Sequence, residues 1–425
     1  MVDILSSLLS LIDLFAIAGG GGSSSGGGGG GGSSGGGGSS FSGGGSSGSG
    51  DGSFSIPILL ITVLIFTVIS VIIALGARQA AKAIQARRAR IRAELLALAA
   101  KDKVWEPDEM VTRARETFMQ YQKDWSSFNL DSMKTYMTPE YYQHNLLMMG
   151  ALKLAARQND VQNPVVTLAH IHEYSDDTDN SKDTYTVQMA VQVFDVLNDT
   201  QDQKKLFSQY LTASEFYKFK RVGSKWLFAG IDQATANPAL HNQQLQDFAT
   251  KNKYFYSLDW GYLLLPRRGQ LFSSGRFGVS DINNHVIGLS KQTIVQFYTY
   301  VPTPQQPADS YLIAQVAVPK KYGNIVVRRK KGFWGRVKGL RKIQTEWGDF
   351  NSMYEVFASD SELATSFELL HPRYMEQLQA LDFEVNIEVV DNLIYFYTAE
   401  KGIVKPEHYE VMQSLLDRAF KEMRM

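Results

Sequence analysis

Two histidines and an acidic loop are the first residues of this sequence that could hold a metal ion. His170 and His172 lie two positions apart in a β-rich run, so a strand would place both on one face. A metal site would need further ligands, and Glu173 points to the other face. An acidic loop follows, which contains Asp176, Asp177, Asp179 and Asp183. Its spacing departs from the Ca²⁺-loop pattern and lacks the central glycine, so we expect a solvated loop. The sequence therefore predicts no metal and no cofactor.

Catalytic motifs are absent from the sequence. There are no cysteines, which excludes thiol catalysis and disulfides. No nucleophile elbow, Walker-type phosphate loop or metalloprotease helix occurs. We therefore predict a protein that is not an enzyme. The alternative is a hydrolase or isomerase, because a pocketed α+β domain can host acid–base chemistry with a lone Asp and Tyr.

Two basic clusters carry the strongest local charge. The first contains Arg78, Lys82, Arg87, Arg88, Arg90 and Arg92. The second surrounds Phe333 and Trp334 and contains Arg328, Arg329, Lys330, Lys331, Arg336, Lys338, Arg341 and Lys342. Basic residues interleaved with aromatic residues are typical of surfaces that bind anionic lipids or nucleic acids. The alternatives are a solvated loop for the second cluster and a role in topology alone for the first. Because the formal net charge is zero and a membrane segment is present, we predict contact with anionic lipids and no nucleic-acid partner.

Residues 56–76 predict a transmembrane helix. They carry no charge, and about 20 apolar residues in a helix cross a hydrocarbon core of roughly 30 Å. The first basic cluster follows this segment at once, whereas only Asp51 lies just before it. The positive-inside rule then places residues 78–425 in the cytoplasm and the preceding Gly/Ser tract outside. We predict a single-pass protein of the plasma (inner) membrane.

The flanking segments have simpler compositions. Residues 1–18 read either as an amphipathic helix or as a signal-like segment, and the sequence leaves both open. Residues 19–55 are almost entirely Gly and Ser, which predicts a disordered linker because such a tract has no side chains to bury. Residues 77–104 are rich in Ala, Leu, Arg and Gln, which predicts a basic juxtamembrane helix.

Residues 105–250 predict an α+β domain. Pro107 suits the first turn of a helix over 107–127, and a second helix follows Thr138-Pro139-Glu140. Residues 164–174 are β-rich, and 184–194 alternate with a period of two. A hairpin covers 215–231 with its turn at Gly223-Ser224. Helices followed by antiparallel strands favour a sheet curled around its helices.

This region resembles the Tim-44-like domain family. The matching residues are Trp105, Phe118, Gln122, Trp125, Asn129, Leu130, Tyr136, Thr138, Pro139, Glu140, Tyr142, Glu215, Phe216, Phe219, Arg221, Trp226, Gly230 and Ile231. The resemblance implies a cone-like fold similar to nuclear-transport-factor-2-like domains, with Trp105, Phe118, Trp125, Pro139, Phe219 and Trp226 as its motif core. It also implies an apolar pocket linked to lipid association and the tethering of partner proteins at membranes. The membrane segment resembles the bacterial, membrane-anchored members, and the pocket residues stay unknown.

Residues 251–425 predict a second α+β domain. Strands are expected at 293–300 and 311–318, and helices at 360–380 and 405–423. A hairpin is expected over 383–397 around Asp391-Asn392. The stretch from Tyr322 to Asp360 resembles a bacterial domain of unknown function that accompanies membrane proteins, which implies a fold but no activity.

The sequence as a whole predicts a membrane-tethered binding or scaffold protein. Its cytoplasmic cone domain would bind an acyl chain, an apolar peptide or a partner protein at the membrane surface. The hydrolase or isomerase in the same pocket stays the alternative, and a spacer without a ligand is a third interpretation. The ligand, the partner and the oligomeric state are not fixed by the residues.

Overall fold

The computed structural model describes the backbone of residues 56–233, 241–258, 263, 282–300, 311–330, 337, 339–359, 369–398 and 405–422. The predicted helix or signal-like segment at 1–18 and the linker at 19–55 lie outside these residues. The chain consists of two units, Met1–Glu94 and Leu95–Met425.

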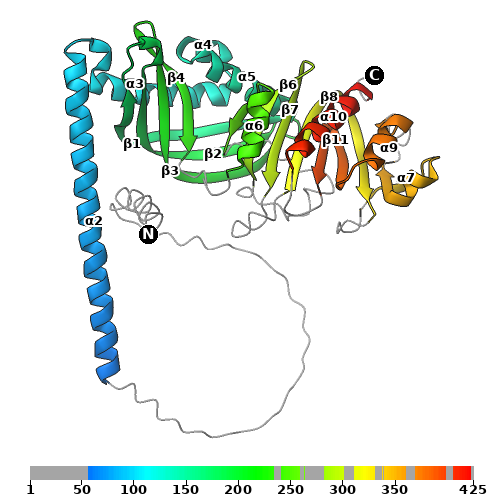
Figure 1. Cartoon of the computed structure of the whole chain (residues 1–425), viewed down its shortest axis with the longest axis horizontal. Helices are drawn as coiled ribbons and strands as arrows, with labels where there is room; N and C mark the ends of the chain where they lie inside the picture. Colours follow the sequence, from blue (N-terminus) through cyan, green and yellow to red (C-terminus); the bar gives the residue numbers. More distant parts are fainter. Residues whose placement is uncertain are drawn as a thin grey trace. The chain divides into compact units, whose positions relative to one another are not determined.

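One long helix begins the described chain. Helix α2 covers Ile56–Ala99, 44 residues with Pro57 harmlessly in its first turn, which corresponds to about 65 Å of helix (Figure 1). Among the residues whose side chains are described, no helix is both long and apolar enough for a membrane span. The side chains of residues 56–74 lie outside that set, so the predicted transmembrane segment stays a prediction.

The Leu95–Met425 unit begins with helices and a four-stranded sheet, which we call the first sheet. The helical elements are η1 (Lys103–Trp105), α3 (Pro107–Ser127), α4 (Leu130–Tyr136), α5 (Pro139–Leu154) and the short η2 (Asn180–Lys182). The strands are β1 (Arg157–Ser175), β2 (Thr184–Asp199), β3 (Lys204–Val222) and β4 (Lys225–Gln233). All neighbours are antiparallel, in the order β1-β2-β3-β4. The predicted helix at 107–127 and the hairpin around Gly223, whose φ is +61°, are confirmed.

Irregular pairing curls the first sheet. The β1–β2 register shifts at three places, one of them beside Asn163, which has a φ of +50°. Such bulges bend a strand and increase its twist. Helices α3 and α5 lie against the curled sheet (Figure 1). The α+β class with curled antiparallel sheets is therefore what the structure shows.

Seven strands form a second sheet. They are β5 (Phe255–Ser257), β6 (Ile282–Ser290), β7 (Thr293–Tyr300), β8 (Tyr311–Arg329), β9 (Arg341–Ile343), β10 (Tyr354–Ala358) and β11 (Val385–Thr398). The order is β5-β6-β7-β8-β10-β9, and β11 also pairs with β8. The long strand β8 therefore connects most of this sheet: Ile313 pairs with Tyr298 on β7 and with Tyr397 on β11.

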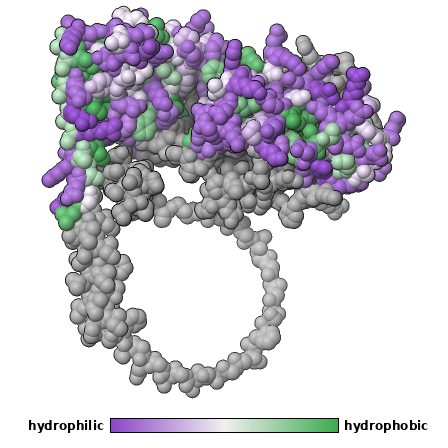
Figure 2. All heavy atoms as spheres, viewed as in Figure 1, coloured by the Kyte–Doolittle hydropathy of each residue, from purple (hydrophilic) through white to green (hydrophobic). Residues whose placement is uncertain are grey.

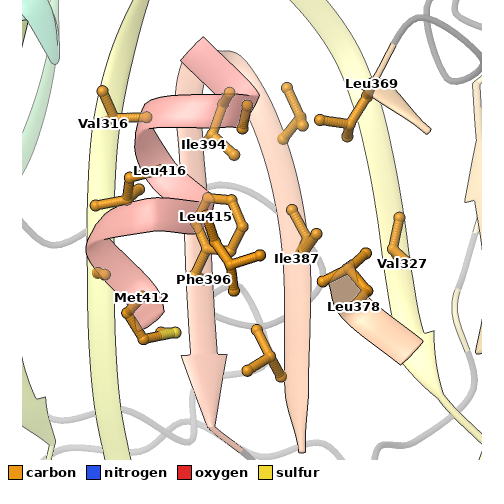
Figure 3. Packing of buried hydrophobic residues seen from close by; sticks show 14 of the residues in the cluster. Val316, Val327, Leu369, Leu378, Ile387, Ile394, Phe396, Met412, Leu415 and Leu416 are labelled. Carbon is orange, nitrogen blue, oxygen red and sulfur yellow. The ribbon is translucent and has the colours of Figure 1, made fainter. Parts of the chain in front are cut away.

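Helices cover one face of the second sheet. They are α6 (Gln243–Lys251), α7 (Gly348–Met353), α9 (Pro372–Gln379) and α10 (Pro406–Glu422). Figure 3 shows Met412, Leu415 and Leu416 of α10 packing over Phe396 of β11. Helix α6 spans the predicted domain boundary at residue 250, and its Leu245 lies in this core. In the view of Figure 2 most of the described surface of the Leu95–Met425 unit is hydrophilic, as expected of a unit with its apolar side chains inside.

Two predictions for the second domain need correction or completion. The hairpin at 383–397 is wrong: β11 is a single strand that pairs with β8 throughout, and Asp391 pairs with Tyr322 between two register shifts. Asp391-Asn392 therefore marks a bulge and not a turn. The helix at 360–380 is seen as α9, and its part at 360–368 lies outside the described residues.

Candidate functional site

Aromatic side chains fill the space between the first sheet and its helices. Trp105 and Trp226 contact each other edge to face at 5.0 Å, and the Trp226 Nε1 donates to the Val104 carbonyl at 2.8 Å. Phe118 of α3 meets Tyr217 of β3 at 5.9 Å. Five of the six motif residues named from the sequence are buried, namely Trp105, Phe118, Trp125, Phe219 and Trp226. Pro139 is exposed and begins α5, directly after the Thr138 cap.

A buried ion pair lies beside the start of β2, at one end of this interior. Arg221 of β3 contacts Asp183 at 3.2 Å and Asp102 at 2.6 Å. Asp183 is fully buried and also accepts from the Asp177 backbone N–H at 2.8 Å. The expectation that all four aspartates of the acidic loop are solvated is therefore wrong for Asp183. The cause is its position at the start of β2, beside a cation that is nearly as buried as itself.

The most unusual group of the interior is the carboxyl of Glu215. Strand β3 alternates, so that Glu215, Tyr217 and Phe219 all face inward. Burial raises the pKa of Glu215 to about 7, against the opposing effect of a hydrogen bond from the Tyr217 hydroxyl. Its Oε2 is buried and has no hydrogen-bond partner among the described residues. Glu215 pairs with Gln233, the last residue of β4, so it lies at the point of β3 where the pairing with β4 ends.

Helix α5 adds a phenol to the same place. The Tyr141 hydroxyl is also buried. Burial raises the Tyr141 pKa, and hydrogen bonds with Tyr121 and Asn145 oppose this effect. Tyr121 of α3 donates to Asn145 Oδ1 at 3.0 Å. We call Glu215, Tyr141, Tyr217, Tyr121 and Asn145 the interior polar site.

The sequence does not predict this site, although it contains a signal. In the sequence, Glu215 stands out only as a match to the family pattern. A charged residue on the apolar face of a strand, two positions before Tyr217, marks a buried carboxyl. Recognising it requires knowing which face of β3 is inside, and neighbouring strands decide that.

Two further histidines lie buried near the second sheet. His144 of α5 stacks on Phe255 at 5.0 Å, and His285 of β6 contacts Gln296 Oε1 through Nε2 at 2.9 Å. Burial lowers the pKa of His144 to about 3, and His285 contributes electrostatically. Burial lowers the pKa of His285 to about 4. Both rings are therefore neutral at ordinary pH.

The histidines singled out from the sequence do share a face of β1. His170 pairs with Gln188, and the His172 ring packs against Phe216 at 4.9 Å, next to Gln188 across the sheet. Among the described residues, no group of three or more His, Cys, Asp or Glu side chains could hold a metal ion.

The two basic clusters lie on different elements and have different surroundings. In α2 the side chains of Arg78, Lys82, Arg87, Arg90 and Arg92 are exposed, and Arg88 is half-buried. In the second cluster Arg328 contacts Glu355 at 2.8 Å, and Lys342 contacts the same carboxylate at 2.7 Å. Arg329 donates to the Phe383 carbonyl at 3.2 Å, and Lys330 is exposed. Lys331, Phe333, Trp334, Arg336 and Lys338 lie outside the described residues.

Comparison with known proteins gives limited information. No family model and no curated protein matches the chain. A crystal structure of the mycobacterial trehalose monomycolate transport factor A, TtfA, is similar at 11% identity and a TM-score of 0.35, covering 44% of this chain and 96% of that one. The intermembrane space region of the chloroplast protein ARC6 is similar at 9% identity and a TM-score of 0.24, covering 29% and 95%. Similarities this weak assign no function, and the Tim-44-like family stays a prediction.

Proposed function

We propose that this chain is a membrane-tethered binding or scaffold protein. Residues 56–76 would span the plasma (inner) membrane once, with the Gly/Ser tract outside and residues 78–425 in the cytoplasm. The folded unit would bind an apolar ligand, such as an acyl chain or peptide, or a partner protein at the membrane surface. Membership of the Tim-44-like family is part of the same proposal.

The observation that carries this proposal is the continuity of α2. One helix contains both the uncharged segment and the basic segment, from Ile56 to Ala99. If residues 56–76 cross the bilayer, the rest of the helix extends about 35 Å beyond it. Each Lys or Arg close to an anionic leaflet contributes about 1 kcal/mol. Five of the six cations of α2 are exposed, which supports lipid contact, whereas Arg328 and Lys342 are paired with Glu355.

Cysteine labelling tests the tether and its orientation, because the native chain has no cysteine. Ser40→Cys places a thiol in the Gly/Ser tract, and Lys182→Cys places one on the exposed η2 turn. In intact cells a membrane-impermeant maleimide should label only Ser40→Cys, and permeabilisation should expose Lys182→Cys. The reversed pattern would overturn the orientation, and release of the protein by alkaline carbonate would overturn the tether.

Lipid analysis tests the headgroup contact separately. The chain is extracted in mild detergent, and the lipids that remain bound are identified by mass spectrometry. Replacing the six cations of α2 by Gln should lower the anionic share of the retained lipids. The matched control replaces Arg328 and Lys342, which should change that share less. An unchanged anionic share in the α2 variant would reject the lipid contact.

A hydrolase or isomerase acting in the interior stays the second candidate. Glu215 supports it, since a carboxyl with a pKa of about 7 can give and take a proton at neutral pH. Binding is the smaller inference, because catalysis would in addition need a reacting atom held against Glu215.

A further inference from the structure

The first sheet has a second face, directed away from its helices. Phe118 of α3 contacts Tyr217, and Tyr141 of α5 contacts Phe228, so both helices lie on the inner side of the sheet. Side chains alternate along a strand, so the residues between the inward ones point to the opposite side. We call that side the outer face, and its middle contains Val165, Leu168, Gln192, Phe194, Tyr210 and Thr212.

The middle of the outer face carries no charge, although charged residues make up 20% of the whole chain. Tyr210 is 65% exposed, Val165 is 48% exposed, and Thr212 is exposed as well. The cores of protein–protein interfaces are depleted in charged residues and enriched in aromatic ones. A surface for anionic lipids or nucleic acids would need cations at this place. The composition therefore indicates a protein partner.

The polar groups of the outer face suit a second copy of the same face. The Tyr210 hydroxyl donates to Gln192 Oε1 at 2.9 Å. Amide and hydroxyl side chains, such as those of Gln192 and Thr212, can both donate and accept hydrogen bonds. A face built from them can match itself, and no like charges oppose each other across the contact. A strongly charged partner would find no opposite charge to pair with.

Opposite charges border this face at one end. Thr186 of β2 pairs with Glu173 on β1 and with Lys218 on β3, so the two charged residues lie in one row on either side of it. Lys218 stays 45% exposed despite its contact with Asp232. A two-fold axis along β2 would set Glu173 of each copy opposite Lys218 of the other. Such an axis also aligns the strands of the two sheets, as is usual when sheets pack face to face.

The size of the outer face suits a contact between tethered chains. About 30 Å of strand across β1, β2 and β3, which lie about 4.8 Å apart, gives on the order of 400 Å². A stable interface between free proteins buries about 800 Å² on each partner. Two chains confined to one membrane meet at a raised effective concentration, so a smaller interface is sufficient there.

We propose that the outer face of the first sheet is an interface between two copies of this chain, related by a two-fold axis along β2. Val165, Gln192 and Thr212 form one row across the three strands. In the dimer this row lies against itself in reverse order, so Val165 of one copy faces Thr212 of the other. The inference goes beyond the proposed binding function and rests only on its membrane tether.

Site-directed cross-linking of the full chain in its membranes tests the proposal. Two differently tagged chains are co-expressed, one with Val165→Cys and one with Thr212→Cys, and the native chain adds no thiol. A short bis-maleimide should join unlike chains several-fold more than like chains. Lys123→Cys in both chains is the control for random collision, because Lys123 is exposed on α3, and it should give little product.

A charge placed in the outer face should separate the copies. Tyr210→Lys in both chains should lower the cross-linked product about tenfold, because it sets an unpaired charge into the contact. Val222→Lys is the matched control: it adds the same charge at a 50% exposed apolar position of β3 beyond the face, and the product should not change.

Three results would overturn the dimer. They are equal products from like and unlike chains, a product that survives Tyr210→Lys, and a cross-link to a different protein in place of the second copy. Resistance to alkaline carbonate scores the tether separately. The cross-link is read in whichever fraction holds the chain, so a failed tether and a failed dimer are told apart.

Discussion

Arg221 Nη1 lies 3.2 Å from Asp183 Oδ2, and the two side chains are only 8% and 0% exposed. This ion pair joins the end of β3 to the start of β2. Asp102, just before η1, completes it from the half-exposed side. The arrangement ties the segment that follows α2 to the first sheet.

Replacing one partner of this pair should be costly. Arg221→Met leaves Asp183 charged and buried, so we expect a loss of about 3–5 kcal/mol in the free energy of unfolding. The double variant Arg221→Met/Asp183→Asn should recover much of that loss, because the amide is neutral and can still accept from Asp177. Chemical denaturation of the full chain measures both. A double variant no more stable than the single one would contradict the coupling.

Glu215 should make the protein less stable as the pH rises. Its pKa is about 7 in the fold and 4.5 ordinarily, so the folded state holds the proton more tightly between those values. Stability from this group is then highest below pH 4.5 and falls until pH 7, by roughly 3 kcal/mol in all. Glu215→Gln should abolish this fall, and thermal melts at pH 5 and 7.5 measure it. An unchanged pH slope would show that the carboxyl is solvated.

His144 should make the protein less stable as the pH falls, which is opposite to the effect of Glu215. Its pKa is about 3 in the fold and 6.5 ordinarily, so the unfolded chain binds the proton first as the pH falls. Stability from this ring is complete above pH 6.5 and is lost as the pH falls toward 3. His144→Gln should flatten the acid side of the stability profile. His241→Gln is the control, because that ring is exposed, and its profile should match the parent's.

The two effects overlap in the native protein. Between about pH 4.5 and 6.5 the Glu215 and His144 contributions have opposite signs, so the parent profile hides both. The single variants are therefore more informative than the parent, and their slopes should differ in sign within that window.

Trp226 should be a major source of stability for the first sheet. It is 5% exposed and contacts Trp105 and Tyr185. Trp226→Ala should cost about 3–5 kcal/mol. Tyr210→Ala removes an aromatic ring that is 65% exposed on β3 and should change stability by less than about 1 kcal/mol. Equal effects of the two substitutions would mean that the hairpin is not packed as described.

Local patterns predicted the elements with strong end signals. Pro107 and the apolar spacing through Trp125 placed α3, and Gly223 placed the β3–β4 turn. The predictions that were wrong concern residues whose structure depends on a partner distant in the sequence. Asp391-Asn392 has turn chemistry, but pairing with Tyr322 makes it part of a strand. Asp183 reads as a solvated loop acid until Arg221, 38 residues later, is placed beside it.

The candidate site was harder to predict than the fold. Its members come from α3, α5 and β3, and their chemistry depends on burial and on hydrogen bonds between these elements. Spacing along the chain carries no information about either. Glu215 differs from a surface glutamate because it is buried and accepts a hydrogen bond from the Tyr217 hydroxyl.

The pairing of β8 also sets an order of folding during synthesis. Within the described residues, each strand of the first sheet pairs with a strand next to it in sequence, so this sheet can form while the ribosome is still making the rest. The second sheet cannot be completed so early, because Ile313 of β8 pairs with Tyr397 of β11, which is made much later. The core of this sheet also needs helix α10, near the end of the sequence. Until then one edge of β8 is open to other strands, and a nascent chain stalled before β11 exposes that edge to aggregation.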